Sequence, residues 1–255
     1  MEILRVNKLD VHVGDLAISI DLNLSVMSQD RWCLLGRNGV GKTTLLHSLI
    51  GLYPATSGEI LIEQCRLGQL KRRELAKKAG ILFQDGLDAM PATVLETVML
   101  GRHPHVQSLL LDTPEDLAMA RACLRDFGLE GLADRQITSL SGGERQRLAL
   151  ARLLAQQPRL YLLDEPSNHL DIAYQVTLQK VLQARMNRDA AALIMATHDI
   201  NLAARFCDHF LLLNGDGTAI AGTREEVLTR DRLAEAFECR IESASVQGVD
   251  YFYPA

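Results

Sequence analysis

The chain has 255 residues, 47% of them apolar and 23% charged, which is ordinary for a globular protein with a sizeable core. A net charge of −5 gives no general basic field, so nucleic acid is not expected as the main partner. No apolar run is long enough to cross a bilayer, the start is no signal peptide, and five scattered cysteines indicate free thiols in a cytosolic chain rather than disulfides or a metal site.

Strand patterns come first along the chain. Residues 18–26 alternate apolar and polar side chains, which predicts a half-buried antiparallel strand. Residues 60–62, after a turn, predict another strand. Residues 80–84 predict a short buried strand that ends on the polar Gln84.

From about residue 86 to 158 the pattern becomes helical. Thr113 is a predicted helix cap, Pro114 stands at the first helical position and Gly128 ends that helix. The near-continuous apolar runs at 160–164 and 192–197 then predict parallel strands that are covered on both faces. A helical segment is therefore inserted between the two halves of an α/β core.

A glycine-rich loop joins the apolar run 32–35 to a helical pattern at 45–50. Strand, loop and helix in this order form the phosphate cradle of nucleoside-triphosphate-binding proteins. A glycine-rich turn that merely caps a helix is the alternative, but it does not account for a lysine that can reach phosphates or a threonine hydroxyl that can ligate magnesium. The predicted phosphate-binding residues are Gly36, Arg37, Asn38, Gly39, Val40, Gly41, Lys42, Thr43 and Thr44.

Two adjacent acids, Asp164 and Glu165, end the apolar strand 160–164. Buried acids at the end of a parallel strand need a cation or hydrogen-bond donors, and ligands bind at such ends. Asp164 is a candidate magnesium ligand, and Glu165 is a candidate base for a water that attacks the γ-phosphate. A solvated turn is the alternative for an isolated Asp-Glu pair.

Ser141 and Glu144 have the spacing of a capping box at the start of a helix that continues toward Pro158. A capping box does not require the two glycines between them, Gly142 and Gly143. Those glycines expose the helix N-terminus, where a second phosphate group could bind.

These motifs resemble, in order and spacing, the nucleotide-binding subunit of an ATP-binding-cassette (ABC) transporter over essentially the whole chain. The matching motifs are the Walker A loop 36–44, the Q-loop glutamine Gln84, the signature motif 140–144, the Walker B strand with the catalytic glutamate 160–165, the D-loop 167–171 and the switch histidine His198.

The resemblance implies an α/β fold in a single domain, residues 1–255. Its core, at about 1–84 and 159–255, is of the P-loop NTPase (RecA-like) type with a mainly parallel sheet. An antiparallel β-subdomain lies at the N-terminus, and an α-helical subdomain is inserted at about 85–158.

The resemblance also implies roles for residues and cofactors. Two copies face head to tail, and each ATP lies between the Walker A loop of one copy and residues Ser141, Gly142, Gly143 and Glu144 of the other. Asp171 helps to align the two sites, and His198 hydrogen-bonds the γ-phosphate unless it is only a satisfied histidine at a strand end. The implied cofactors are ATP and Mg²⁺; the implied catalytic residues are Glu165, His198 and Gln84, and the implied metal ligands are Thr43, Gln84 and Asp164.

The segment 98–105 carries Gly-Arg-x-Pro-His, which resembles an element of importers for iron-siderophore complexes, haem and cobalamin, as does the segment 222–229. A loop that ends at a proline is the alternative. The expected partners are a second copy, integral membrane permease subunits and, indirectly, a solute-binding protein, with the chain on the cytoplasmic face of the plasma membrane. A soluble ABC ATPase that acts on ribosomes or DNA is the competing hypothesis, and a P-loop kinase leaves 140–144 and Glu165 unexplained.

One departure from the family pattern concerns the base of the nucleotide. The position expected to carry an aromatic residue that stacks on adenine holds Val13, beside His12, and loss of an aromatic platform costs about 1 kcal/mol. We therefore predict weak discrimination between ATP and GTP. A competition binding assay measures it, and a strong preference for ATP would contradict the prediction. The Asp30-Arg31 pair also replaces the family's usual Gly-Glu, and nothing in the sequence explains that change.

Overall fold

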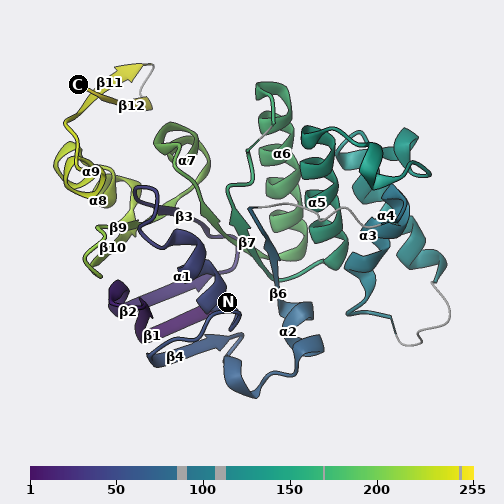
Figure 1. Cartoon of the computed structure of the whole chain (residues 1–255), viewed down its shortest axis with the longest axis horizontal. Coiled ribbons are helices and arrows are strands. Elements are labelled where there is room, and N and C mark those ends of the chain that lie inside the picture. The colour runs from purple at the N-terminus through teal and green to yellow at the C-terminus, as the bar shows by residue number, and fades with distance from the viewer. Residues whose placement is uncertain (85–90, 107–112, 169, 247–248) are drawn as a thin grey trace. The chain divides into compact units, whose positions relative to one another are not determined.

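The computed structural model of the chain describes residues 1–84, 91–106, 113–168, 170–246 and 249–255 (Figure 1). Two compact units make up the chain: the terminal unit, residues 1–70 and 192–255, and the inserted unit, residues 71–191. The predicted helical subdomain at about 85–158 stays a prediction. Residues 85–90 of that segment and His169 of the predicted D-loop lie outside the described residues.

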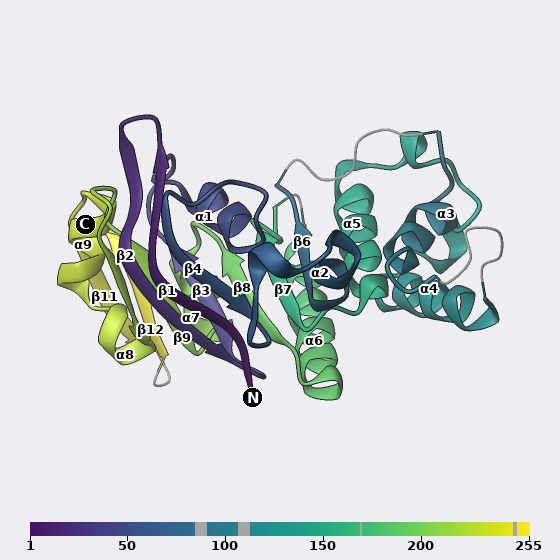
Figure 2. The same ribbon diagram turned by 90° about the horizontal axis from the view of Figure 1, so that it is seen from below.

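An antiparallel sheet forms the first part of the terminal unit, and Figure 2 shows two of its strands as a long hairpin. In the second strand, alternate residues from Leu22 to Val26 are buried, which confirms the half-buried strand predicted from the alternation. A short 3₁₀ turn, Leu67–Gln69, follows the sheet. In sheet order the strands are β2 (Leu16–Met27), β1 (Glu2–Val13), β4 (Ser57–Ile62) and β5 (Cys65–Arg66).

Parallel strands form the second part of the terminal unit. The central strand β3 lies between two parallel neighbours, and its last four residues are fully buried, as its apolar sequence requires. In sheet order the strands are β10 (Ala219–Thr223), β9 (His209–Leu213), β3 (Arg31–Leu35) and β8 (Ala192–Ala196). The helices are α1 (Lys42–Leu49), α7 (Ile200–Phe206), α8 (Arg224–Val227) and α9 (Arg230–Phe237), and the hairpin of β11 (Ile241–Val246) and β12 (Val249–Pro254) ends the chain.

The inserted unit combines two parallel strands with helices. Strand β6 (Ala79–Leu82) pairs with β7 (Leu160–Asp164). The predicted strand 80–84 therefore ends two residues early, at Leu82, and Phe83 and Gln84 lie exposed beyond the last pair. The other elements are α2 (Arg72–Lys78), α3 (Val94–Met99), α4 (Pro114–Asp126), α5 (Gly142–Gln156), α6 (Ile172–Asp189) and the 3₁₀ turns Leu100–Arg102, Glu130–Leu132 and Ile137–Ser139.

Helix α4 begins and ends as the sequence predicts. The Thr113 hydroxyl accepts a hydrogen bond from the Asp116 backbone N–H at 3.1 Å, Pro114 is the first helical residue, and Gly128 adopts a left-handed φ of 66° beyond the end. No described helix is both long enough and apolar enough to cross a membrane.

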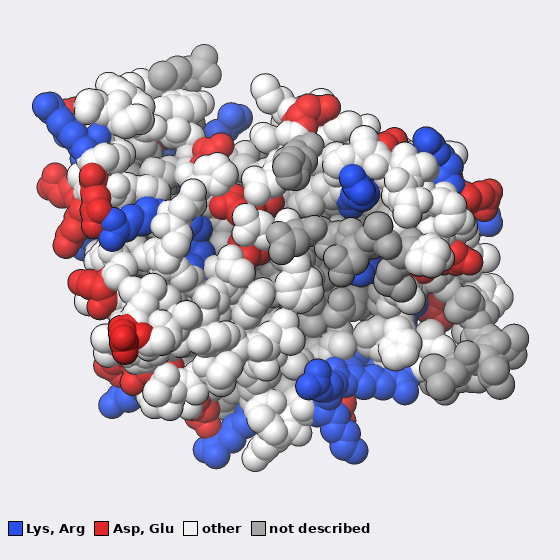
Figure 3. Space-filling model, in the orientation of Figure 1, with Lys and Arg blue, Asp and Glu red and all other residues white. Residues whose placement is uncertain are grey.

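A basic surface lies on α2, although the chain as a whole is acidic. Figure 3 shows Lys and Arg side chains gathered at the lower edge of this face, where Figure 1 places α2. The helix and the residue before it supply Lys71, Arg72, Arg73, Lys77 and Lys78. One of them has a structural role: Arg73 donates to the carbonyl oxygen of Pro104 at 3.0 Å.

The segment 98–105, which resembles an importer element, packs against α4 and α5 within the inserted unit. Gly101 lies so close to α5 that a Cβ would meet the Arg152 carbonyl oxygen at 2.2 Å. The buried Arg102 side chain donates to Asp116 of α4, and to the Ala155 carbonyl at the end of α5, each at 2.7 Å. We call this cluster the Arg102 latch. The glycine and the arginine of the motif thus have a packing role in this chain.

Two ionisable groups of this region have shifted pKa values. Burial alone would raise the pKa of Asp116, but hydrogen bonds from Arg102 and Thr113 lower it on balance. The charged pair therefore stabilises the fold at neutral pH, and its contribution is lost as the pH falls through this lowered pKa. Burial also lowers the pKa of His105, whose Nε2 donates to the Gln156 carbonyl at 2.8 Å, so acidification below about 6.5 works against the fold.

The Arg102 latch predicts a large loss of stability for Arg102→Ala. Removal of one partner of a buried pair leaves Asp116 charged and uncompensated, at a cost of about 3–5 kcal/mol in the free energy of unfolding. Urea unfolding of the full chain measures this, with the exposed Arg121→Ala on α4 as the matched control. Equal losses in the two variants would contradict the latch.

Candidate functional site

The glycine-rich loop 36–44 has the arrangement of an anion cradle. It runs from the end of β3 into the first turn of α1, where Thr43 and Thr44 are half-buried. The Lys42 side chain is 8% exposed, and its Nζ donates to the carbonyl oxygens of Gly36 at 2.8 Å and Arg37 at 3.1 Å. The charge is thus held over the loop by two neutral acceptors, from which it can turn to a phosphate.

Two glycines of this loop are required by packing. Gly36 has a φ of 145°, and a Cβ there would lie 2.9 Å from the Leu213 carbonyl oxygen. Gly41 has a φ of 100°, and a Cβ there would lie 2.3 Å from the Ile18 side chain. A larger residue at either position would displace the loop. Exposed Gly39, in contrast, would place a Cβ in open space.

Neighbouring parallel strands bring the switch histidine to this loop. Strand β3 pairs with β8 so that Leu34 lies opposite Ala196. Because their carboxyl ends share one edge of the sheet, the Gly36 loop and the Thr197-His198-Asp199 segment follow side by side. Thr197 is fully buried and its hydroxyl accepts from the Asp199 N–H at 3.2 Å, whereas His198 is exposed.

The same geometry brings three predicted residues together in the inserted unit. Leu82 of β6 lies opposite Leu163 of β7, so Gln84 and the pair Asp164 and Glu165 follow at one edge. Both acids are buried, at 1% and 6% exposed, and Gln84 is exposed in a turn. Buried acids at this edge are suited to a cation or to a water held for reaction.

The backbone of Glu165 is left-handed, with a φ of 48°. A residue with a Cβ costs about 1–2 kcal/mol in this conformation. Strained backbone of this kind concentrates at functional sites, where the side chain must point in one direction. The backbone conformation therefore supports Glu165 as a functional candidate, and this observation cannot be made from the sequence motif.

The predicted capping box forms at the N-terminus of α5. The Ser141 hydroxyl accepts from the Glu144 N–H at 3.3 Å, and the Glu144 carboxylate accepts from both the N–H and the hydroxyl of Ser141 at 2.8 Å. These hydrogen bonds lower the pKa of Glu144, so it is charged at neutral pH. Ser141 and Gly142 are exposed, and Gly143 is half-buried, so the helix end stays open to a ligand.

One further hydrogen bond joins α5 to the chain after β7, and another caps α6. Buried Gln146 of α5 donates to the Pro166 carbonyl at 3.2 Å, directly after Glu165. Asp171 of the predicted D-loop is the cap of α6, where its carboxylate accepts from the Tyr174 N–H at 2.9 Å. The next residue, Ile172, is 80% exposed.

The predicted site residues thus fall into two sets. Residues 36–44 and His198 lie in the terminal unit, and Gln84, Ser141–Glu144, Asp164, Glu165 and Asp171 lie in the inserted unit. No group of three or more His, Cys, Asp or Glu side chains that could hold a metal occurs among the described residues. A magnesium ion would accordingly be held by few protein ligands and by phosphate oxygens, which is its usual coordination at nucleotides. Thr43 and Asp164 offer the oxygen ligands that it prefers.

Comparison with known proteins agrees with these motifs. The family described as "ABC transporter" matches residues 20–168. The chain is 34% identical to the iron(3+)-hydroxamate import ATP-binding protein FhuC of Bacillus subtilis, over 95% of this chain and 90% of that protein. It is 35% identical to the cobalamin import ATP-binding protein BtuD of Halobacterium salinarum over 93% of its length, but it spans only 59% of that protein.

A solved structure gives the same result for the fold. The ATP-binding cassette MJ0796, a dimer in a post-hydrolysis state bound to ADP and Pi, superimposes with a TM-score of 0.75. The two chains are 28% identical, and the match covers 86% of this chain and 98% of that one. The α/β fold inferred from the resemblance is therefore confirmed.

The strained backbone at position 165 predicts opposite effects on stability and activity. In Glu165→Asn, a residue that tolerates the left-handed region replaces one that does not. We expect an unchanged or higher free energy of unfolding, by up to about 1 kcal/mol, and loss of nucleotide hydrolysis. Gln64→Asn, at another left-handed position in the turn between β4 and β5, is the control that should keep full activity. A strongly destabilised Glu165→Asn chain would contradict this account.

Proposed function

The chain belongs to the ABC transporter family as an ATP-binding ATPase, and on this premise we propose that it is the subunit whose ATP hydrolysis drives an importer. The observation that carries the proposal is the buried Lys42, held over a glycine-rich loop at the sheet edge where the segment of His198 also follows. A phosphate chain bound there meets one fixed cation and the open N-terminus of α1.

ATP binding uses residues 36–44. The backbone N–H groups and Lys42 would neutralise the β- and γ-phosphates, and Thr43, Gln84 and Asp164 are the residues that would ligate Mg²⁺. When bound, the ion neutralises charge that develops on the phosphate oxygens. The residues fit the ion because a hydroxyl, a carboxylate and an amide all offer oxygen.

Hydrolysis is assigned to Glu165, with Gln84 and His198 as its partners. Glu165 orients a water and accepts its proton as that water attacks the γ-phosphate. Its burial and constrained backbone fix the direction of the carboxylate, which favours this role over a solvated turn. Gln84 contacts the ion and the water, and His198 donates to the γ-phosphate.

A second copy supplies Ser141, Gly142 and Gly143 to the γ-phosphate, and Asp171 aligns the two sites across the pair. The open N-terminus of α5 supports this, and so does the dimeric state of the related cassette with ADP and Pi. In the single chain, Glu144 occupies the donors of Ser141. The incoming phosphate therefore takes over hydrogen bonds that the capping carboxylate holds, and ATP draws the copies together.

The proposed cargo is an iron complex, such as a siderophore complex or haem, or cobalamin. It rests on the names of the hydroxamate and cobalamin relatives. The Gly101–His105 motif adds no separate support, because its glycine and arginine have a packing role in the Arg102 latch. The partners are integral membrane permease subunits, reached from the cytoplasmic face, and indirectly a solute-binding protein. Co-purification with ribosomes in place of a membrane protein would contradict this part.

Two substitutions test the shared site. Glu165→Gln keeps ATP binding, lowers kcat by about 10²-fold or more because the base is lost, and accumulates an ATP-bound dimer. Ser141→Arg keeps nucleotide binding by the single chain but blocks dimer formation and turnover, through bulk and charge at the phosphate. Nucleotide titration, light scattering and phosphate release measure these effects, with Lys42→Ala as the variant that binds no ATP. Normal turnover in Glu165→Gln would place the base elsewhere, and normal turnover in Ser141→Arg would refute the shared site.

A further inference from the structure

An ion pair joins the phosphate loop to the C-terminal part of the chain. Arg37, in the loop, pairs with Glu238 at the end of α9. The same Arg37 side chain lies against the turn between β9 and β10, where a Cβ on Gly215 would meet its Nη2 at 3.3 Å. Since the Arg37 carbonyl accepts from Lys42, whatever fixes Arg37 also acts on the phosphate-binding lysine.

Glu238 stands at a position where another residue is expected. Its φ is 52°, the left-handed conformation that ends many helices and that glycine or asparagine usually occupies. A glutamate there costs conformational energy that a glycine would not. Gln157 and Ala190 end α5 and α6 in the same conformation, so it is the ion pair with Arg37 that distinguishes Glu238.

A second contact joins the same part of the chain to the segment of His198. Asn201, in the first turn of α7, donates to the Phe252 carbonyl of β12 at 3.0 Å and accepts from the Phe252 N–H at 2.8 Å. Helix α7 is capped by Asp199, the residue after His198. The side chain of Asn201 therefore fixes α7 to the C-terminal hairpin by two hydrogen bonds.

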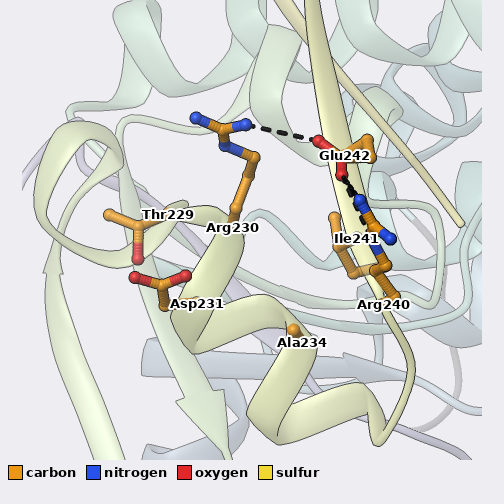
Figure 4. A pocket seen from close by; sticks show the side chains of 7 residues that line it. All are labelled: Thr229, Arg230, Asp231, Ala234, Arg240, Ile241 and Glu242. Atoms are coloured by element: carbon orange, nitrogen blue, oxygen red, sulfur yellow. Dashed lines mark hydrogen bonds and ion pairs between the residues drawn. The ribbon is translucent and has the colours of Figure 1, made fainter. Parts of the chain in front are cut away.

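The hairpin itself is attached to α9 across an open cavity. Figure 4 shows Arg230 of α9 and Arg240 both pointing toward Glu242 of β11. The distances are 3.3 Å from Arg230 and 2.8 Å from Arg240. The cavity between them is about 440 Å³ and is also lined by Thr229, Asp231, Ala234 and Ile241. Besides these exposed ion pairs, the buried Ile241 and Phe252 pack the hairpin against the rest of the chain.

From these contacts we propose that the C-terminal segment, residues 224–246 and 249–254, positions the nucleotide site through two contacts, that of its Glu238 with Arg37 and that of its Phe252 with Asn201 of α7. Glu238 holds Arg37 and so preorganises the phosphate loop for ATP, while Asn201 holds α7 and so fixes the position of His198. Both are positioning residues, since neither touches the nucleotide. The proposal rests on the proposed function, because it presumes that residues 36–44 bind ATP.

The two positions act on different quantities. A loop that is already in its binding conformation binds more tightly, so Glu238 affects the Kd for ATP. The position of His198 matters for the transition state, so Asn201 affects kcat. A role confined to fold stability would change both together with the melting temperature.

The first experiment measures the Kd for ATP on the full chain by titration. Glu238→Gln is expected to raise the Kd by about two- to fivefold, the range of one exposed ion pair, with kcat unchanged. The ratio between variant and parent falls toward one at high salt, because screening removes the same interaction. The control is Glu235→Gln, an exposed carboxylate on the same helix, which leaves the Kd unchanged. In a double-mutant cycle, Arg37→Gln and Glu238→Gln are not additive.

The second experiment measures kcat at saturating ATP. Asn201→Ala is expected to lower kcat by about three- to tenfold with an unchanged Kd. Asn201→Asp keeps the acceptor for the Phe252 N–H and loses the donor. Its kcat is expected to lie between those of the parent and the alanine variant. Thermal unfolding of each variant shows that the chain is folded.

The outcomes separate this proposal from the one on which it rests. If the parent binds ATP no better than Lys42→Ala, the proposed function fails. If the parent binds ATP but Glu238→Gln matches Glu235→Gln, or if the Arg37 and Glu238 effects add, the role of Glu238 is overturned. If Asn201→Ala turns over normally, or changes Kd and kcat in parallel, the role of Asn201 is overturned.

Discussion

The pairing of neighbouring parallel strands places the phosphate loop beside the His198 segment, and Gln84 beside the acids 164 and 165. Backbone hydrogen bonds set the register of β3 with β8 and of β6 with β7, and each register aligns the carboxyl ends of two strands. The residues that follow those ends are the phosphate loop and the His198 segment in one case, and Gln84 and the acids 164 and 165 in the other. A shift of one residue in either register would separate the members of a pair, so the chemistry depends on the apolar packing that holds the strands.

Two helix N-termini, those of α1 and α5, supply further groups of the proposed site, and they differ in what occupies their hydrogen-bond donors. The start of α1 is open, and Lys42 is held back by two carbonyl oxygens. At the start of α5 the carboxylate of Glu144 accepts the hydrogen bonds of Ser141. A phosphate that reaches α5 must therefore compete with a negative charge already in place.

The sequence predicts the local features of this protein well, because each depends on neighbours along the chain. The capping box at Ser141, the cap and proline of α4 and the alternation in β2 are all interactions within a few residues. The five cysteines are free thiols, as their spacing indicates, and burial raises the pKa of Cys123 to about 11.

What the sequence does not predict are contacts between distant residues. Arg37 with Glu238 and Asn201 with Phe252 join positions that no local pattern relates, and both involve the part of the chain after β10, outside the motifs. The left-handed backbone of Glu165 likewise escapes sequence reasoning, because it arises where β7 leaves the sheet. Strand β6 likewise ends at Leu82, two residues before the predicted end, and no local pattern marks that end.

The close approach of Gly101 to the backbone of α5 has a consequence for how related chains diverge. A helix pair in contact through main-chain atoms cannot accept even a methyl group at that point, and the neighbouring guanidinium spans the remaining gap. Homologues that share these two residues are therefore expected to share the tight crossing of that 3₁₀ turn with α5, whatever solute their transporters carry. The segment Gly101–His105 then indicates a shared architecture, and the transported solute can differ between chains that carry it.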